Sequence, residues 1–192
     1  MIRKEEKEKT RKRIIKFAID EFTEYGYRGA KTARIAEKAG VAHGTVFLHF
    51  RNKDTLLYEI IHERLFEVSN RLYSAIAESK NPENMLRVHL QHIGEELAFE
   101  SMLARELPLF PQDLRRKIFA IRSGVIAQFY DVLIAEIQEN RIKDINPTIA
   151  LNFWFGTINY FLANQDMFAP PGKIIELKGE DMIRFFITTI RR

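Results

Sequence analysis

The sequence predicts an all-α fold of about nine helices, and three observations carry this prediction. Apolar residues recur three and four positions apart through most of the 192 residues. The 6 prolines and 9 glycines are few, and they stand where helices should end. No segment shows the strict alternation of polar and apolar residues that is typical of half-buried strands.

Four helices are predicted in the first part of the chain. Residues 10–26 place apolar side chains at helical spacing and end at Gly26, and residues 30–40 form a short helix that ends at Gly40. Residues 42–50 form a third, short helix. Asn52 then caps a long amphipathic helix over residues 53–79.

Five further helices are predicted in the rest of the chain. One reaches to about Glu100, and a short one follows that is broken at Pro108 and Pro111. Residues 112–140 form a long helix. Residues 146–168 form a helix that is apolar nearly all round, residues 169–179 a loop, and residues 180–192 the last helix.

Composition is that of a globular protein without disulfides. Hydrophobic residues make up 46% and charged residues 29%, and cysteine is absent, which excludes thiolate metal sites and a cysteine nucleophile. The segment MIRKEEKEKTRKR is too charged for a signal peptide. The most apolar run, residues 149–163, is shorter than a membrane span. We expect a cytoplasmic protein with no membrane partner and no cofactor.

Charge is spread unevenly along the chain. Residues 1–53 hold 14 Lys and Arg against 7 Asp and Glu, a net +7, whereas the remainder holds 16 against 19, a net −3, and the sum is the +4 of the whole chain. A basic end on a slightly acidic body is expected where that end meets a polyanion. A solvated lysine-rich arm would have the same composition, so charge alone leaves both alternatives open.

Residues 30–50 have the outline of a helix-turn-helix, in which the second helix lies in the major groove of DNA. Ala42, Gly44 and Thr45 are small enough for close approach to a groove, and the polar tips of His43 and Thr45 can reach base edges. No acidic residue stands between Ala39 and Arg51 to repel phosphates. A helical hairpin without a ligand has the same outline.

The stretch FTEYGYRGAKTARIAEKAGVAHGTVFLHFRNKDTLL resembles the DNA-binding domain of the TetR/AcrR family of transcriptional regulators. The matching elements keep their order and spacing without a gap, and they include Gly26-Tyr27, Ala39-Gly40-Val41, Gly44-Thr45, His49-Phe50 and Lys53. Beyond Leu57 the resemblance is only architectural. It implies a helix-turn-helix domain over residues 1–52 and a helical ligand-binding and dimerisation domain over residues 53–192.

The resemblance further implies a homodimeric repressor that binds double-stranded DNA at a palindromic operator and is released by a small, hydrophobic effector. By position, residues 43, 44, 45 and 48 would face bases, and residues 47, 49 and 53 phosphates. The implied DNA-binding residues are Lys31, Thr32, Arg34, His43, Gly44, Thr45, Phe47, Leu48, His49 and Lys53.

The sequence departs from the family pattern at three places. Ala42 replaces the usual Ser or Thr before the third helix, and a lost cap costs about 1 kcal/mol. Ala30-Lys31 replaces Thr-Thr or Thr-Ser, so Thr32 becomes the nearest substitute cap and Lys31 a candidate phosphate contact. Phe47 replaces a tyrosine and lacks the hydroxyl that would reach a phosphate.

The apolar helix at residues 146–168 and the last helix are expected to form a dimer interface. A helix that is apolar on all sides must be buried on all sides, and Gly156 would let a partner helix come close. The expected interface residues are Asn152, Phe155, Gly156, Phe185 and Ile190. A core formed within one chain is the alternative.

Aromatic and polar residues of the body indicate a ligand pocket. The candidates are His89, His92, Glu96, Phe99, Phe119, Arg122, Phe129, Trp154 and Asn159. His89, His92 and Glu96 share a helix face, but without a second ligand helix no metal site is predicted. Arg122 could meet an anionic effector or pair with a glutamate at the surface.

Two other functions compete with a ligand-released repressor. A hydrolase or lyase built on His89, His92 and Glu96 lacks any accompanying triad, phosphate loop or nucleotide motif, so we expect no enzyme. A DNA-bound structural or division-linked factor without an effector would share the fold, because a fold does not fix what the body binds.

Overall fold

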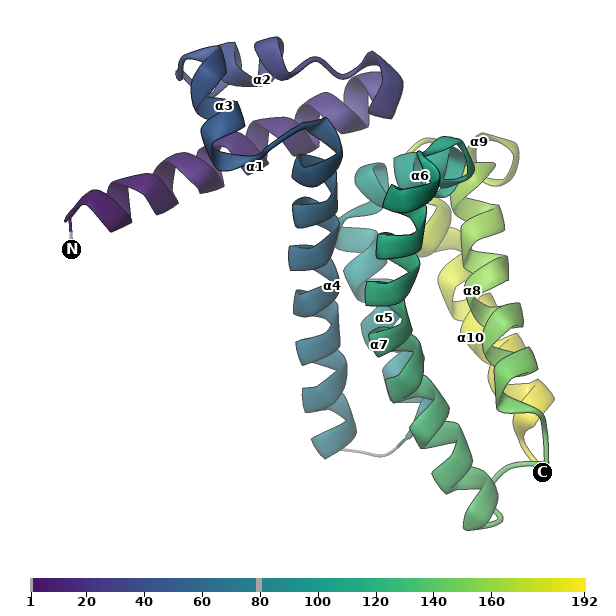
Figure 1. Ribbon diagram of the computed structural model, residues 1–192. Helices are drawn as coiled ribbons and strands as arrows, with labels where there is room; N and C mark the ends of the chain where they lie inside the picture. Colours follow the sequence, from purple (N-terminus) through teal and green to yellow (C-terminus); the bar gives the residue numbers. More distant parts are fainter. Residues whose placement is uncertain (1, 79–80) are drawn as a thin grey trace. The chain divides into compact units, whose positions relative to one another are not determined.

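The computed structural model describes residues 2–78 and 81–192. These residues form ten α-helices and one short 3-10 helix, with no strand beyond an isolated bridge between Ile142 and Arg191 (Figure 1). The predicted all-α class is therefore confirmed. The predicted end of the fourth helix, Ser79, lies outside the described residues.

The helices follow one another in a simple order. The first four are α1 (Ile2–Gly29), α2 (Thr32–Lys38), α3 (His43–His49) and α4 (Lys53–Glu78). Next come α5 (Pro82–Glu95), α6 (Leu97–Glu106), the 3-10 helix η1 (Leu107–Leu109) and α7 (Gln112–Gln138). The chain ends with α8 (Pro147–Ala163), α9 (Gln165–Phe168) and α10 (Ile174–Ile190).

The chain divides into two compact units, and both are discontinuous in sequence. Unit 1 comprises residues 1–64 and 106–118, and unit 2 comprises residues 65–105 and 119–192. The sequence predicts a single division of the chain, after residue 52. In the structure, three helices contribute residues to both units: α4 passes from one unit to the other after Arg64, α6 at Glu106 and α7 after Ile118.

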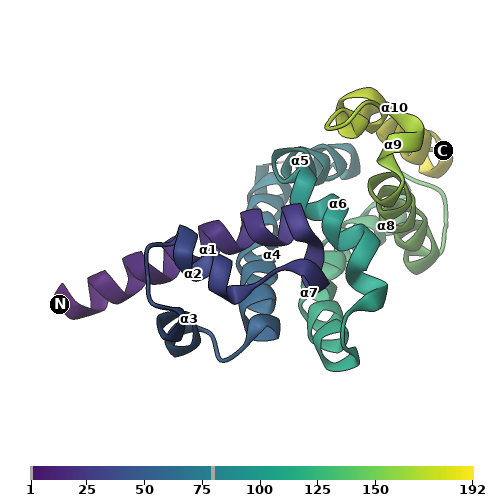
Figure 2. The same cartoon turned by 90° about the horizontal axis from the view of Figure 1, so that it is seen from above.

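Unit 1 is built around one apolar stripe of α1. Ile14, Ala18 and Phe22 are fully buried on this stripe, and they recur at helical spacing. Helix α2 packs on α1, and α3 packs on α2 (Figure 2). Val46 and Phe50 hold the inner side of α3 at 1% exposure each. The stripe therefore positions α3 with its opposite side outward.

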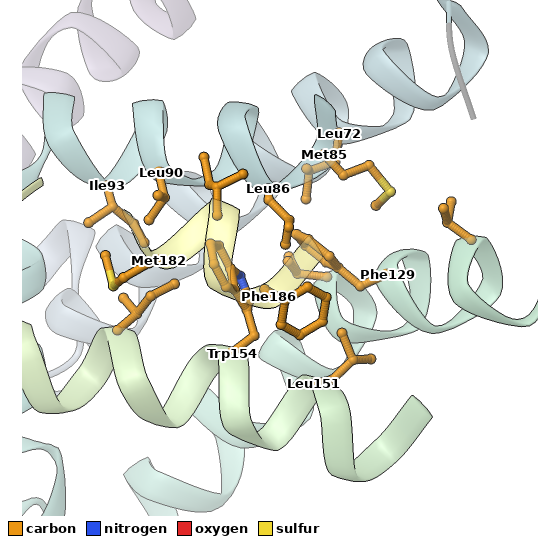
Figure 3. Packing of buried hydrophobic residues seen from close by; sticks show 14 of the residues in the cluster. Leu72, Met85, Leu86, Leu90, Ile93, Phe129, Leu151, Trp154, Met182 and Phe186 are labelled. Atoms are coloured by element: carbon orange, nitrogen blue, oxygen red, sulfur yellow. The ribbon is translucent and has the colours of Figure 1, made fainter. Parts of the chain in front are cut away.

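Unit 2 has one apolar core made by α4, α5, α7, α8 and α10. Figure 3 shows Phe186 beside Trp154 within this cluster, with Leu86, Phe129 and Leu151 near them. Helix α5 packs closely on α10, where a Cβ at Gly179 would lie only 3.3 Å from Leu90. Burial of these apolar side chains provides the main stabilisation of the helical bundle.

Several predicted element boundaries are wrong, for local reasons. Helix α5 stops at Glu95, because Glu96 leaves the helical conformation with φ −115° and ψ 19°, and α6 begins at once. Asn164, with φ −121° and ψ 29°, separates α8 from the short α9. The last helix starts at Ile174 rather than at residue 180, directly after the turn at Gly172, whose φ is +78°.

By length and composition alone, α7 is the one described helix that could cross a membrane, and 28% of its most apolar stretch is buried. Such a single helix is weak support for a membrane span, since apolar helices of soluble bundles meet the same condition.

Candidate nucleic-acid interface and interior cavity

Helix α3 presents an outward face made of His43, Gly44, Phe47 and Leu48. Leu48 is 82% exposed and Phe47 44% exposed, unusually high values for apolar side chains. A Cβ at Gly44 would meet nothing within 4 Å. His43 lies edge-on against Phe47, with 5.0 Å between the ring centroids. Packing does not require this face, so it is free for a partner.

The start of α2 is held by a side chain that sequence reasoning did not identify. Neither Lys31 nor Ala42 caps its helix with a side-chain hydrogen bond. Instead, the backbone N–H of Lys31 donates to the carboxylate of Glu21 at 3.0 Å. Thr32, expected as a substitute cap, is the first residue of α2, and its hydroxyl lies 2.9 Å from Nε2 of His43.

The carboxylate of Glu21 is fully buried and forms ion pairs with two basic residues of α2. The guanidinium of Arg34 donates to it at 2.6 Å, and Lys38 lies at 3.7 Å. Burial alone would raise the pKa of this carboxyl, but the hydrogen bonds from Arg34 and Lys31 lower it below its usual range. An acid on the apolar stripe of α1, three residues after Ala18, was the sequence signal for this pair.

The ammonium of Lys53 is occupied within unit 1. It donates to the carbonyl oxygen of Tyr27 at 2.6 Å and to that of Ala30 at 3.2 Å, and it lies 4.6 Å from the centroid of the Tyr27 ring. Burial lowers the pKa of this group. The candidate phosphate contact thus caps the end of α1, where carbonyl groups favour a cation.

Tyr27, near the end of α1, contacts the end of α6, the start of α4 and Phe110. Its backbone N–H donates to Glu106 at 2.6 Å, its hydroxyl donates to Asp54, and its ring centroid lies 5.0 Å from that of Phe110. Gly26 has φ +67°, and a Cβ there would collide with the Glu106 carboxylate. Only glycine fits both the backbone conformation and this approach.

In unit 2, His89 lies in an aromatic cluster with Phe129, Trp154 and Phe155. The indole N–H of Trp154 donates to Nδ1 of His89 at 3.3 Å, and the Phe129 and Phe155 rings stand edge-on to His89 at 5.5 and 5.2 Å. Burial, with the charges of His92 and Arg122, lowers the pKa of His89 to about 3. The imidazole is therefore neutral, with its proton on Nε2.

An apolar cavity adjoins this cluster at Phe129. Its volume is about 10 Å³, which is barely room for one water molecule. The lining residues come from α5, α7, α8 and α10: Pro82, Met85, Leu86, Phe129, Val132, Leu133, Leu151 and Phe186. A ligand larger than a water molecule can enter this cavity only if these side chains move.

The structure brings only part of the predicted ligand set together. His89, Phe129 and Trp154 meet in the cluster. Of the others, His92 and Phe99 are buried, Glu96 and Arg122 are half-buried, and Phe119 and Asn159 are exposed. Phe119, at 59% exposure, lies on the outside of α7 rather than in the core. Among the described residues, no three His, Asp or Glu side chains are arranged to hold a metal.

Helices α8 and α10 expose large apolar side chains. Phe153 is 71% exposed, Phe185 76% and Tyr160 55%, and a Cβ at Gly156 would meet nothing within 4 Å. Asn152 is exposed as well.

Two expected interface residues lie behind this face. Ile190 is 2% exposed and belongs to the core of its own protomer. Phe155 packs on His89 and Phe129.

Comparison with known proteins identifies the class of the chain. Residues 14–60 match the family described as "Bacterial regulatory proteins, tetR family". The fatty acid metabolism regulator protein of Bacillus subtilis is 30% identical over 151 residues, which cover 76% of this chain and 78% of that protein. An HTH-type transcriptional repressor of Mycobacterium tuberculosis is 27% identical over 77% of each chain.

Solved structures show the same fold. The regulator FadR of Bacillus subtilis, in complex with stearoyl-CoA, superposes with a TM-score of 0.82 at 24% identity, covering 93% of this chain and 98% of that one. FadR of Bacillus halodurans superposes with a TM-score of 0.80 at 21% identity, covering 94% and 99%. The chain therefore belongs to the TetR family, and it is a DNA-binding transcriptional regulator with an N-terminal helix-turn-helix domain.

Proposed function

We propose that this protein is a cytoplasmic dimeric repressor that leaves its operator when a long-chain acyl-CoA binds inside unit 2. The observation that carries the proposal is the interior of unit 2, where a cavity lined by apolar side chains lies next to a buried hydrogen-bonded pair, His89 and Trp154. A ligand with a long hydrocarbon part and one acyl carbonyl suits this chemistry. The relative that regulates fatty acid metabolism and the stearoyl-CoA complex support the same ligand class.

The small volume of the cavity makes the length of the acyl chain decisive. Each methylene moved from water into an apolar interior contributes about 0.8 kcal/mol. Opening the core must displace packed side chains such as Met85, Phe129 and Phe186, at a cost that a short acyl chain does not offset. Long acyl chains should therefore bind, and acetyl-CoA should not.

His89 is suited to orient the acyl group. Its Nδ1 accepts the Trp154 N–H, so its Nε2 carries the proton and can donate to a carbonyl oxygen. Because burial keeps the imidazole neutral, it meets the ligand as a hydrogen-bond donor and not as a cation.

We assign the DNA contacts to α3 and to the start of α2. His43, Gly44, Thr45 and Leu48 face bases, while Phe47 and His49 lie toward the DNA backbone together with Lys31, Thr32 and Arg34. Two copies joined through α8 and α10 would present two α3 helices to a two-fold symmetric operator, with half-sites spaced by about one helical turn or a multiple of it.

The test measures operator binding by fluorescence anisotropy with stearoyl-CoA, acetyl-CoA, free CoA and stearate, all below their micelle concentrations. We expect stearoyl-CoA alone to weaken binding by at least about tenfold, a usual size for coupling between two sites. Equal affinity with and without stearoyl-CoA would reject acyl-CoA as the effector.

A variant that fills the cavity tests the ligand site, and a substitution at an exposed position is its matched control. Leu151→Phe adds volume to the lining, so it should bind the operator normally and respond less to stearoyl-CoA. Ile126→Phe, at a position 39% exposed on α7, should respond as the original protein does.

A further inference from the structure

The outward face of α3 has an unusual chemistry for a DNA reader. Its four residues are His43, Gly44, Phe47 and Leu48, which supply one imidazole, no side chain at one position and two apolar groups. None is an arginine, lysine, asparagine, glutamine or carboxylate. The face therefore lacks the side chains that form paired hydrogen bonds with guanine or adenine in the major groove.

The one polar tip on this face already has a contact. Nε2 of His43 lies 2.9 Å from the hydroxyl of Thr32, and the His43 ring rests edge-on against Phe47. These two contacts hold the imidazole in place on α3. Hydrogen bonds from this face can thus define little of a base sequence.

Leu48 is the most exposed large apolar side chain in the described part of the protein, at 82%. It is the sixth of the seven residues of α3, which lies within the residues 14–60 that match the family. The next residue on the same face, Gly44, leaves open space beside it. An exposed leucine of this kind has no role in the core of unit 1, because Val46 and Phe50 hold the opposite side.

We infer that Leu48 reads the C5-methyl group of a thymine in each operator half-site. The thymine methyl is the apolar feature of the major groove, and it is the base-specific signal that an alkyl side chain can detect. Open space at Gly44 would allow the base edge to approach. Phe47 is less suited to this role, since it is half as exposed and is held by His43.

This inference rests on the assignment of α3 as the base reader, and its test contains no effector. Half-sites are first selected from random duplexes with the full-length protein. Each thymine is then replaced singly by deoxyuridine, which removes the methyl group and keeps every hydrogen-bonding group. One thymine per half-site should lose about fourfold in affinity, and about 15-fold when both half-sites are changed, as expected for one buried methyl group.

The matched variants are Leu48→Ala and Ile126→Ala. Leu48→Ala should bind the thymine and deoxyuridine duplexes almost equally, whereas Ile126→Ala, truncated at an exposed position of α7 in unit 2, should keep the original difference. The first part of the test uses the unaltered protein, so it does not depend on how a variant folds.

Three results would overturn the inference. No thymine at a fixed position of the selected half-site would exclude a methyl contact. Equal losses on both duplexes in Leu48→Ala would mean that the leucine contacts DNA without reading the methyl group. Unchanged binding in Leu48→Ala, with no sensitive thymine, would show that this face of α3 is not the base reader. Each of these results would leave intact the proposal that acyl-CoA releases the protein from its operator.

Discussion

The ammonium of Lys53 donates to the carbonyl oxygen of Tyr27 at 2.6 Å, and this contact joins the first residue of α4 to the end of α1. The sequence had indicated Lys53 as a phosphate contact. In the structure the same group stabilises the end of a helix, whose carbonyls lack partners within the helix. Its main effect should therefore be on the stability of unit 1.

Lys53→Met keeps the aliphatic stem and removes the three donors. Hydrogen bonds to charged groups contribute about 1.5–3 kcal/mol, so we expect the free energy of unfolding of unit 1 to fall by about 2 kcal/mol in urea titrations. The salt dependence of operator binding should stay unchanged. A slope reduced by one contact per half-site would mean that the ammonium moves to a phosphate in the complex. Lys12→Met, at an exposed position of α1, is the control.

Glu21→Gln should loosen α2. The change leaves the guanidinium of Arg34 without its counter-charge, so the start of α2 should be held less firmly. Amide hydrogens of α2 should exchange faster while those of unit 2 do not. Glu24→Gln alters an exposed carboxylate of α1 near Lys38 and should have little effect. Unchanged protection of α2 in Glu21→Gln would argue against the cap.

Phe47→Tyr should strengthen operator binding. Phe47 is 44% exposed beside His43, so an added hydroxyl would point to solvent or to DNA and not into the core. One regained hydrogen bond contributes about 1 kcal/mol per half-site, which titration of the operator at several salt concentrations would detect. Weaker binding at every salt concentration would show that the Phe47 ring lies away from the DNA backbone.

Stability should fall with acid because of His89. The pKa of this imidazole is about 3 in the folded protein, against about 6.5 in an unfolded chain. The unfolded state therefore takes up a proton first as the pH falls below about 6.5, and the free energy of unfolding should decrease by about 1.4 kcal/mol per pH unit down to about pH 3.

Trp154 is the sole tryptophan of the chain and contacts His89, so its fluorescence reports unfolding of unit 2 at each pH. His89→Gln should reduce this slope, while His62→Gln, at an exposed position, should leave it unchanged. An identical slope in His89→Gln would assign the acid sensitivity to other groups.

Gly156→Leu should disrupt the proposed dimer. The position is open within the protomer, so the added side chain would meet only a partner, and monomers should appear in sedimentation. Operator affinity should drop by about 100-fold or more, because a monomer loses the effective concentration of the second reader. Gly124→Leu, an equally open helical glycine on α7, is the matched control. A Gly156→Leu protein that remains dimeric would place the interface elsewhere.

The sequence by itself determined the helical class and the position of the helix-turn-helix. Helical spacing of apolar residues and the glycines at 26 and 40 are local signals, because they act through backbone conformation and one helix face. Both glycines have positive φ, Gly26 at a kink within α1 and Gly40 in the turn after α2. The exposed face of α3 followed from the same periodicity, since burial of Val46 and Phe50 leaves its other side outward.

Tertiary structure alone decided what individual polar groups do. Glu21 caps α2 and Lys53 caps α1 across 10 and 26 residues of sequence, and no local pattern encodes such distances. The same limit applies to unit 2, where Phe155 turned inward to His89 and Ile190 into the core. A helix that is apolar on every side carries no periodic signal of which residues meet its own protomer, so only the packing of neighbouring helices separates the interior from the surface left to a partner.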